Sequence, residues 1–414
     1  MFSGWQFVEV RELIGQGVIS GVQDGNHGND HPKSSEYVNC GIPFIMARDL
    51  EGGRINTSSC AYLKRSRADR LRIGFAETGD ILLSHKGTVG AVAEVQSGFD
   101  YVMLTPQVTY YRIGDPERLS REFLKQVFLG PEFQSRLATI SAQSTRAYVG
   151  ITEQKRLKIP LPPLPEQRRI ADILRTWDEA IEKLEALRMA KERRLQGALY
   201  GFFGPTRVVG GGTRPKGWTL SSLGDSFVER KDKNTHLTDA DVVTVGKYRI
   251  GKQTDHFTRS VASKDLSPYW IISSGDFVYD PMSAYYGALG RYNAESDGLV
   301  SPAYRVIQLR RDIIDSDFMV QLLRTAHVRF LLEARSSQGN KEGKRRSLQR
   351  SAFDSIEFFL PPMDEQKRLA AIAADFEADI ASTAREITAL QRQKRGLMQK
   401  LLTGEWRVSK EVLD

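Results

Sequence analysis

One short motif occurs twice in this chain and constrains its fold more than any other feature. LPPLPEQRRIADIL begins at Leu161, and LPPMDEQKRLAAIA begins at Leu360, which is 199 residues later. Both copies open with Leu-Pro-Pro, continue through Glu-Gln, and then place apolar residues at helical spacing. An internal repeat at this distance indicates that a whole domain has been duplicated together with the helix that follows it.

The residues that precede each motif repeat as well. GDILLSHKGTVG begins at Gly79 and GDFVYDPMSAYYG begins at Gly275, an offset of 196 residues. The glycines and β-branched residues after Gly79 predict a strand, a turn and a second strand, and the stretch after Leu104 predicts another strand. Residues 121–138 predict a helix that bends near Gly130-Pro131. We therefore expect an α+β protein with two tandem, pseudo-repeated α/β domains.

Each motif opens a long amphipathic helix. About 37 residues follow each Leu-Pro-Pro without a break, which corresponds to roughly 55 Å of helix. Asp364 is a candidate cap for the second helix. A solvated surface helix is the alternative, but two such helices would each leave an apolar stripe exposed. The 3-and-4 spacing instead predicts that the two helices pair as an antiparallel coiled coil, with Trp177, Ile181, Phe376 and Ile380 on the paired stripes and Glu166, Gln167, Glu365 and Gln366 at the helix starts.

These features predict the domain boundaries. With 414 residues the chain exceeds the size at which one core stops growing. Trp5 and Trp218 open the two copies, and a Gly/Pro-rich stretch separates them. We expect a first domain at 1–158, a first helix at 159–203, a linker at 204–217, a second domain at 218–357, a second helix at 358–408 and a C-terminal tail at 409–414.

The charge balance favours a polyanionic partner. Lysine and arginine number 59 against 51 acidic residues, and the isoelectric point is about 9.3. The excess lies between the long helices, in 62–72 and 336–350, whereas the helices carry mixed charge. No apolar run reaches the length of a membrane span, and the two cysteines show no metal-binding spacing. We expect a cytoplasmic protein that does not bind membranes.

Several motifs resemble catalytic or cofactor sites only superficially. GQGVISG at Gly15 lacks the spacing of a dinucleotide loop, and GNKEGKRR at Gly339 has Arg345 where a phosphate-binding loop needs Ser or Thr. YDPMS at Tyr279 lacks the second proline and the aromatic residue of an amino-methyltransferase motif. His27, Asp30 and His31 are better explained as a solvated loop than as a metal site. We expect a binding protein without catalytic residues, metal or cofactor of its own.

Two polar, basic loops at equivalent positions are the strongest binding candidates. Their cations can neutralise phosphates, and their amide and guanidinium groups can pair with base edges. An ordinary surface role for any single residue stays open. The candidate DNA-binding residues are Lys64, Arg65, Arg67, Lys86, Thr88, Gln143, Ser144, Thr145, Arg146 and Tyr148 in the first copy, and Tyr279, Tyr285, Gln338, Asn340, Lys341, Lys344 and Arg345 in the second.

The duplicated LPPLPEQ-type helix starts, GIPFI at Gly41, GDILLSHKGTVG, TPQV at Thr105 and the final QKRGLMQKLLTGEW resemble the specificity (S) subunits of type I restriction–modification systems. The resemblance covers essentially the whole chain. It departs at LQGALYGFFG, where the family pattern would read LMQKLLTG, which leaves the end of the first helix open. The family's recognition loops vary, so the resemblance does not assign individual side chains to bases.

This resemblance implies a subunit that recognises double-stranded DNA without catalysis. Two target-recognition domains would each read one part of a split sequence, and the paired helices would act as a spacer and as the partner surface. Two methylation subunits would bind the chain and carry S-adenosylmethionine, and restriction subunits, where present, would use ATP and Mg. The alternatives are a self-contained DNA methyltransferase or nuclease, and a DNA-binding coiled-coil regulator that has no methylase partner.

Overall fold

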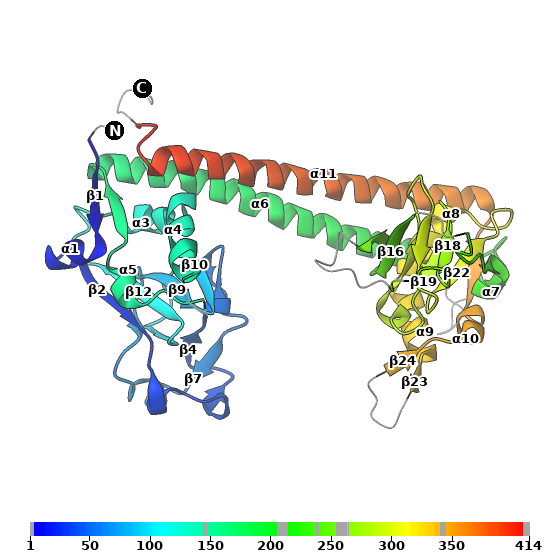
Figure 1. Ribbon diagram of the computed structural model, residues 1–414, viewed down its shortest axis with the longest axis horizontal. Helices are drawn as coiled ribbons and strands as arrows, with labels where there is room; N and C mark the ends of the chain where they lie inside the picture. The colour runs from blue at the N-terminus through cyan, green and yellow to red at the C-terminus, as the bar shows by residue number, and fades with distance from the viewer. Residues whose placement is uncertain are drawn as a thin grey trace. The chain divides into compact units, whose positions relative to one another are not determined.

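The computed structural model describes residues 4–143, 147–204, 214–236, 240–253, 263, 265–339 and 345–408. The chain divides into two compact units, the first formed by Met1–Glu185 with Arg385–Asp414 and the second by Ala186–Ala384. Each unit holds one α/β domain and about half of each long helix, α6 (Leu164–Phe203) and α11 (Met363–Leu402) (Figure 1). The compact units therefore cut across both helices instead of following the boundaries expected from the sequence. Among the described residues, no helix is long and apolar enough to span a membrane.

Two sheets form the α/β domain of the first unit. Across the larger sheet the strands are β2 (Ile19–Asp24), β12 (Val108–Ile113), β9 (Ile81–Lys86), β10 (Thr88–Glu94), β6 (Gly53–Ile55) and β5 (Leu50–Glu51). Across the smaller sheet they are β3 (Tyr37–Val38), β7 (Ala61–Leu63), β4 (Ile42–Ile45), β11 (Val102–Leu104) and β8 (Phe75–Ala76). The predicted strand, turn and strand after Gly79 are confirmed as β9 and β10, and the strand predicted after Leu104 is confirmed as β12.

Helices cover the larger sheet of the first unit. The bend predicted near Gly130-Pro131 is confirmed, because α3 (Arg121–Leu129) ends at Gly130 and α4 (Pro131–Ser141) begins directly after it. Aromatic and aliphatic residues of these helices share one core with β9, β12, the start of α6 and the end of α11. The remaining elements are α1 (Val10–Gly15), α2 (Arg65–Ala68), α5 (Ile151–Gln154) and the short 3₁₀ turns η1 (Gly28–Asp30), η2 (Ser34–Glu36) and η3 (Ala47–Asp49).

A separate two-stranded ribbon joins each domain to its long helix. In the first unit β1 (Gln6–Glu9) pairs antiparallel with β13 (Lys158–Leu161), and α6 begins three residues after β13. In the second unit β14 (Thr219–Ser222) pairs in the same way with β25 (Glu357–Leu360), which precedes α11. The expected boundaries at 158 and 357 therefore fall at the edge of these ribbons. The ribbon keeps the two ends of each domain together where the helix begins.

The second unit repeats the topology of the first. One sheet has the order β15 (Phe227–Arg230), β22 (Arg305–Leu309), β19 (Phe277–Tyr279), β20 (Leu289–Arg291). The other has the order β17 (Arg249–Lys252), β16 (Asp241–Gly246), β21 (Gly298–Val300), β18 (Trp270–Ile272). The smaller sheet of the first unit and the β17–β16–β21–β18 sheet of the second each contain an inner parallel pair, β11 with β4 and β21 with β16. The helices and remaining strands are α7 (Leu223–Ser226), η6 (Ala284–Tyr286), α8 (Ser316–Arg324), α9 (Ala326–Arg335), β23 (Ser337–Gly339), β24 (Arg345–Ser347) and α10 (Arg350–Asp354).

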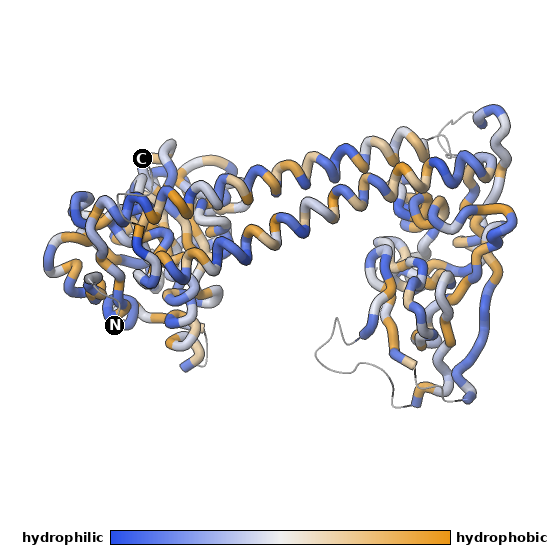
Figure 2. The backbone as a smooth tube through the Cα atoms, turned by 90° about the horizontal axis from the view of Figure 1, so that it is seen from above, coloured by the Kyte–Doolittle hydropathy of each residue, from blue (hydrophilic) through white to orange (hydrophobic). Residues whose placement is uncertain are grey.

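The long helices pair antiparallel within both units. In the first unit Lys394 bonds to Asp178, and in the second Lys191 bonds to Asp379 at 2.7 Å, so residue numbers rise along one helix as they fall along the other. Each helix has 40 residues, which corresponds to about 60 Å. Figure 2 shows hydrophobic and hydrophilic residues alternating along both helices, as expected for a pair with one covered stripe.

Two expectations for the second helix need correction. The helix ends at Leu402, so 403–408 are not helical, and residues 358–360, expected to begin the helix, belong to β25 (Glu357–Leu360). Asp364 is not the cap, because α11 already begins at Met363 and Asp364 lies within its first turn. Proline at 361 and 362 supplies the start, since the first helical N–H groups lack an internal partner in any case. The first helix ends at Phe203, which agrees with its expected boundary, but it begins only at Leu164, and residues 159–161 of its expected range belong to β13.

Candidate nucleic-acid interface

The turn between β9 and β10 lies directly against the loop that follows α4. Gly87 forms the turn with a φ of 79°, and its N–H donates to the carbonyl of Ala147 at 2.9 Å. Lys86 forms a β-bridge with Tyr148. Three predicted residues, Lys86, Thr88 and Tyr148, are thereby brought together and are exposed. We call the group Lys86, Gly87, Thr88, Ala147 and Tyr148 the first tip.

A buried histidine holds the first tip in place. The N–H of Val149 donates to the carbonyl of His85, and His85 Nδ1 lies 3.1 Å from the carbonyl of Val149. The imidazole also packs on the Tyr148 ring, with 5.7 Å between ring centroids. Burial lowers the pKa of His85, and the carboxylate of Asp24 opposes that shift. A neutral ring that fixes Tyr148 is therefore part of the scaffold beneath the tip.

The three predicted basic residues after β7 differ in how the fold uses their charges. Arg67 bonds to Glu36 at 2.5 Å and donates to the carbonyl of Asp30, so its charge is used within the fold. Arg65 pairs with Asp100 and lies over the ring of Tyr101. Lys64 is exposed. These three residues lie at the smaller sheet, whose strands β4 and β7 are at the end of the first unit away from α6 (Figure 1), so the structure does not join them to the first tip.

The second unit has an equivalent tip of different chemistry. The loop between β19 and β20 contains η6, and the N–H of Leu348, just after β24, donates to the carbonyl of Pro281 at 2.8 Å. The Arg346 guanidinium lies over the Tyr285 ring at 5.3 Å, and Tyr285 and Tyr286 meet edge to face. Met282 and Tyr286 are each 46% exposed. We call the group Met282, Tyr285, Tyr286 and Arg346 the second tip.

The prediction that Tyr279 contacts DNA is wrong. Tyr279 is 1% exposed and stacks on Phe353, with 4.7 Å between ring centroids, so it belongs to the core. Burial raises its pKa to about 12. Strand β19 turns this side chain inward, whereas Tyr285 lies at the surface of the loop. Sequence reasoning missed Met282, Tyr286 and Arg346, although the alignment of Met282 with Lys86 at the repeat offset of 196 was a usable signal.

Part of the two predicted loops lies outside the described residues. This applies to Ser144, Thr145, Arg146, Asn340, Lys341 and Lys344. Gln143 is described and exposed at the end of α4. Gln338 and Arg345 lie on the paired strands β23 and β24, and only their backbone is described. These strands are at the end of the second unit away from α11 (Figure 1).

The Glu-Gln pair of each repeated motif anchors the helix to its own domain. Gln167 is fully buried; its Oε1 accepts from the N–H of Ser120 at 2.9 Å, and its Nε2 donates to the carbonyls of Arg118 and Pro162. Gln366 makes the same three contacts, with the N–H of Asp315 and the carbonyls of Ile313 and Pro361. These two glutamines thus anchor the start of each helix to its domain and do not form part of an exposed surface for a partner.

The glutamates of the two motifs each accept a hydrogen bond from a tryptophan indole. Trp5 Nε1 donates to Glu166 at 3.3 Å, and Trp218 Nε1 donates to Glu365 at 3.1 Å. Trp5 and Trp218, expected from the sequence to open the two copies, therefore share one structural role. Glu166 also accepts two hydrogen bonds from Arg407, which lies beyond the end of α11.

The predicted stripe residues of the helices are only partly covered. Trp177 and Ile181 in the first unit, and Phe376 and Ile380 in the second, are all half-buried. The Arg194 guanidinium covers the Phe376 ring at 5.4 Å. Two helices alone cannot enclose a stripe from every side, so part of each of these apolar side chains stays accessible.

A second pair of glutamines, unnoticed in the sequence, braces the domains on their helices. Gln126 of α3 donates to Asp178 of α6 at 3.1 Å. Gln321 of α8 donates to Glu377 of α11 at 3.4 Å, and Arg324 bonds to the same carboxylate. Gln126 and Gln321 are separated by 195 residues, the offset of this part of the repeat, so aligning the two copies would have identified them.

His27 and His31, which lie in one loop, make contacts with residues close to them in the sequence. His27 Nε2 lies 2.6 Å from Asp24 Oδ2, and His31 Nδ1 lies 3.3 Å from the carbonyl of Asn26. Within the part of the chain that the structure describes, no group of three or more His, Cys, Asp or Glu side chains could hold a metal ion. Cys40 and Cys60 are free thiols.

The sequence has relatives among curated proteins. Residues 19–189 match the family model described as "Type I restriction modification DNA specificity domain". The specificity subunit of type I restriction enzyme MjaVIII from Methanocaldococcus jannaschii is 22% identical over 206 residues, which make up 48% of this chain and 46% of that protein. That match thus spans less than half of the relative. A protein of the same organism, named as a specificity subunit of type I restriction enzyme MjaX, is 22% identical over 97% of this chain and 94% of its own length.

Two solved structures share the fold along nearly the whole chain. One is described as "Structural basis underlying complex assembly and conformational transition of the type I R-M system"; it covers 97% of this chain and 98% of its own, at 17% identity and a TM-score of 0.57. The type I restriction–modification S subunit from M. genitalium covers 96% of both chains at 13% identity and a TM-score of 0.52.

A tandem pair of α/β domains, each anchored to one of two paired helices, is the class of protein that this fold defines. By the family match over residues 19–189 and by its curated relatives, the chain is similar to the specificity subunits of type I restriction–modification systems. The fold class and the family expected from the duplicated motifs are thus confirmed.

Proposed function

We propose that this chain reads a bipartite double-stranded DNA target, one part with each unit. The proposal rests on one observation: the same kind of loop contact occurs in both units, but the first tip and the second tip carry different side chains. In the first unit the loop before α5 bonds to β9, because the N–H of Val149 donates to the carbonyl of His85. In the second unit the loop before α10 bonds to the loop after β19, because the N–H of Leu348 donates to the carbonyl of Pro281. A shared scaffold with different surface residues suits two half-sites of different sequence.

The two tips favour different contacts with DNA. At the first tip, Lys86 can neutralise a phosphate, and the hydroxyls of Thr88 and Tyr148 can accept or donate at a base edge. At the second tip, the exposed Met282 and Tyr286 suit the methyl group of thymine, whereas the charge of Arg346 is already paired with Glu333 at 2.6 Å. Lys64 adds an exposed cation on the smaller sheet of the first unit.

The long helices are proposed to fix the spacing between the half-sites and to bind two methylation subunits. Their length of 40 residues each and their half-buried apolar stripes support this role. The partners would carry the S-adenosylmethionine chemistry, and restriction subunits, where present, would carry ATP and Mg. The chain would act without catalysis of its own.

Domain exchange tests the bipartite arrangement. Residues 5–161, which include both strands of the β1–β13 ribbon, would be replaced by the matching segment of another specificity subunit. Methylome sequencing of cells that also express the methylation subunit should show one half-site changed and the other retained. A control chimera exchanges residues 218–360 and should change only the other half-site. A change of both half-sites by either chimera would contradict the proposal.

A further inference from the structure

Two buried polar side chains hold the first tip to its sheet. Both contact the carbonyl of Val149, the residue directly after the tip. Gln154 Nε2 donates to this carbonyl at 2.9 Å, and His85 Nδ1 lies 3.1 Å from it. His85 is 1% exposed and Gln154 is fully buried. The first tip therefore depends on polar anchors that solvent does not reach.

The contact with Val149 fixes the position of the proton on the His85 ring. A carbonyl oxygen can only accept a hydrogen bond, so this contact requires the proton on Nδ1. Nε2 of the neutral ring is then unprotonated, and it is buried without a hydrogen-bond partner among the described residues. A second proton would place a charged N–H at this buried atom with no acceptor beside it, which is a costly arrangement.

The charges near His85 do not offset this cost. Asp24, at the end of β2, favours the charged ring, but its Oδ2 atom already lies 2.6 Å from His27 Nε2. His27 and Lys86 disfavour the charged ring, and burial, the largest influence, lowers the pKa of His85. Uncharged residues contact His85 from the other neighbouring elements: Val89 of β10, Gln107 before β12 and Tyr148 of the tip loop.

The second unit has no titratable side chain at the equivalent positions. At the repeat offsets of 196 and 199 residues, Pro281 corresponds to His85 and Phe353 corresponds to Gln154. The backbone hydrogen bond between the loop and the strand region is retained in both units. Phe353 is 1% exposed and stacks on Tyr279, so an apolar contact takes the place of the polar anchors. The imidazole is therefore a feature of the first tip and not of the repeat.

We propose that His85 is a positioning residue for the first half-site: its neutral ring holds Tyr148 and Thr88 in place, so that recognition of this half-site alone weakens as the pH falls. This inference rests on the proposed function, which assigns one half-site to each unit. A buried ring does not reach DNA itself. It acts through Tyr148, whose ring centroid lies 5.7 Å from that of the imidazole.

The lowered pKa of His85 sets the direction and the pH window of the effect. When the tip is released, the ring meets water and its pKa returns to about 6.5. The contribution of the neutral ring is therefore complete above about pH 6.5 and is lost as the pH falls through the lower pKa of the docked state. At about pH 5.5 a released ring is about 90% protonated, which disfavours docking by up to about 10-fold.

Mismatch penalties at two pH values test this inference. The full chain would be co-expressed with its methylation subunit, and the target sequence would be taken from methylome sequencing. The penalty for a half-site is the Kd of a duplex mismatched there divided by the Kd of the intact duplex, so effects common to all DNA cancel. Fluorescence anisotropy would measure both at about pH 8 and about pH 5.5, on either side of the ordinary imidazole pKa.

The two half-sites should respond differently. The penalty at the half-site read by the first unit, which domain exchange identifies, should fall about 10-fold at the lower pH. The penalty at the other half-site should change by less than about twofold, because proline at 281 does not titrate.

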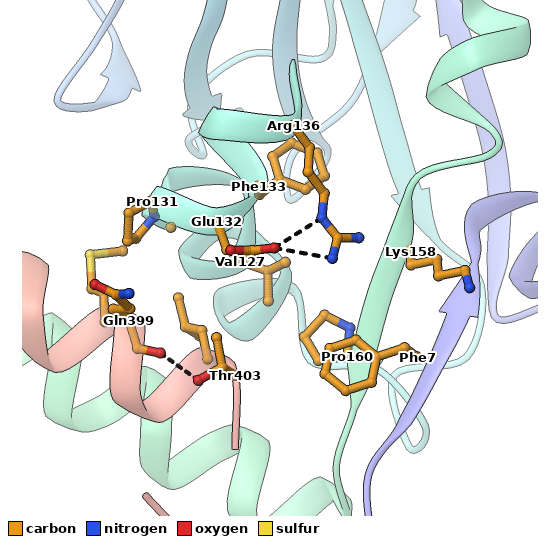
Figure 3. Close-up of a pocket in the computed structure, with 13 residues that line it drawn as sticks. Phe7, Val127, Pro131, Glu132, Phe133, Arg136, Lys158, Pro160, Gln399 and Thr403 are labelled. Atoms are coloured by element: carbon orange, nitrogen blue, oxygen red, sulfur yellow. Dashed lines mark hydrogen bonds and ion pairs between the residues drawn. The ribbon is translucent and has the colours of Figure 1, made fainter. Parts of the chain in front are cut away.

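Three variants isolate the His85 ring. His85→Asn keeps an amide that can donate to the Val149 carbonyl and does not titrate, so its penalties should not depend on pH. His27→Asn removes the neighbouring imidazole and should keep the pH dependence of wild type. Arg136→Gln breaks the exposed pair with Glu132 on α4 and should also behave as wild type. That pair lies in the cleft beside the end of α11, which none of the residues anchoring the first tip lines (Figure 3).

Each outcome has a distinct meaning. Loss of the first penalty alone at the lower pH, absent in His85→Asn, supports the inference. An unchanged first penalty, an equal fall at both half-sites, or a pH dependence that persists in His85→Asn overturns the role of His85 and leaves the proposed function standing. Wild-type protein without a penalty at either half-site at the higher pH overturns the proposed function as well. If circular dichroism shows that His85→Asn is unfolded, the comparison of the two half-sites on wild type decides.

Discussion

At the residue scale, Glu166 joins three parts of the first unit. Its carboxylate accepts hydrogen bonds from the Arg407 guanidinium, from the N–H of Val408 and from the indole of Trp5. Burial alone would raise the pKa of Glu166, but these hydrogen bonds outweigh burial and hold the pKa below its usual range. The start of α6, the N-terminal strand and the segment after α11 therefore depend on one ionised group.

This contact predicts a pH-dependent stability. Because the folded pKa of Glu166 is lowered, its stabilisation is present above the unfolded value of about 4.3 and is lost as the pH falls through the folded value. Hydrogen bonds to a charged group contribute about 1.5–3 kcal/mol, reduced here because the Arg407 side chain is 44% exposed to solvent. Glu166→Gln should lower the Tm of the first unit by about 2–8 °C at pH 7. This difference should shrink below about pH 4.

Differential scanning calorimetry at pH 7 and at acidic pH measures this difference. Glu192→Gln is the matched control, because Glu192 is exposed on the same helix and pairs with Arg188 one turn away. Its effect should stay within a few tenths of a kcal/mol. An equal loss of Tm for Glu166→Gln at both pH values would refute the role of its charge.

Lys86 provides a residue-scale test of the first tip. It is exposed and lies on the turn that Gly87 and Tyr148 fix, so its removal should leave the fold intact. If Lys86 contacts one phosphate, Lys86→Ala should reduce the slope of log K against log salt by about 1 and weaken binding of all sequences alike. Fluorescence anisotropy on a duplex over a salt series measures the slope. Lys183→Ala, an exposed lysine of α6, should leave it unchanged, and an unaltered slope for Lys86→Ala would remove Lys86 from the interface.

At the element scale, the pairing of α6 with α11 is fixed by polar contacts within each unit. Lys394 bonds to Asp178 in the first unit, and Lys191 bonds to Asp379 and Thr383 in the second. Thr383 is buried, and its hydroxyl donates to the Asp379 carbonyl at 3.1 Å while it accepts from Lys191. Polar contacts of this kind favour one register of a helix pair over others.

Lengthening both helices should lengthen the DNA spacer. Insertion of seven residues after Arg188 and seven after Ala384 adds one heptad to each helix and preserves the apolar face. The added length is about 10.5 Å, or about three base pairs at 3.4 Å each. Methylome sequencing should show both half-sites unchanged and the spacer longer by about three base pairs. The length-neutral Lys183→Ala variant is the control, and changed half-sites at constant spacing would contradict the spacer role.

At the scale of the whole molecule, duplication explains why the compact units differ from the expected domains. The end of α6 belongs to the core of the second unit, where Phe203 stacks on Phe318 at 5.1 Å. The end of α11 belongs to the core of the first unit, where Met398, Leu401 and Leu402 are buried. Each unit is therefore completed by the helix that follows the other domain in the sequence. A boundary drawn by sequence order cannot show this exchange.

The sequence by itself determined the duplication, the fold class, the bend at Gly130 and the two long helices. These features follow from local patterns, because apolar spacing, proline and glycine act within a few residues. Tertiary structure alone decided that Tyr279 is buried while Tyr285 is accessible, that Gln167 and Gln366 anchor helices, and that Arg407 reaches Glu166. Such outcomes depend on contacts between residues far apart in the chain, and the type of a side chain does not reveal which neighbours will surround it.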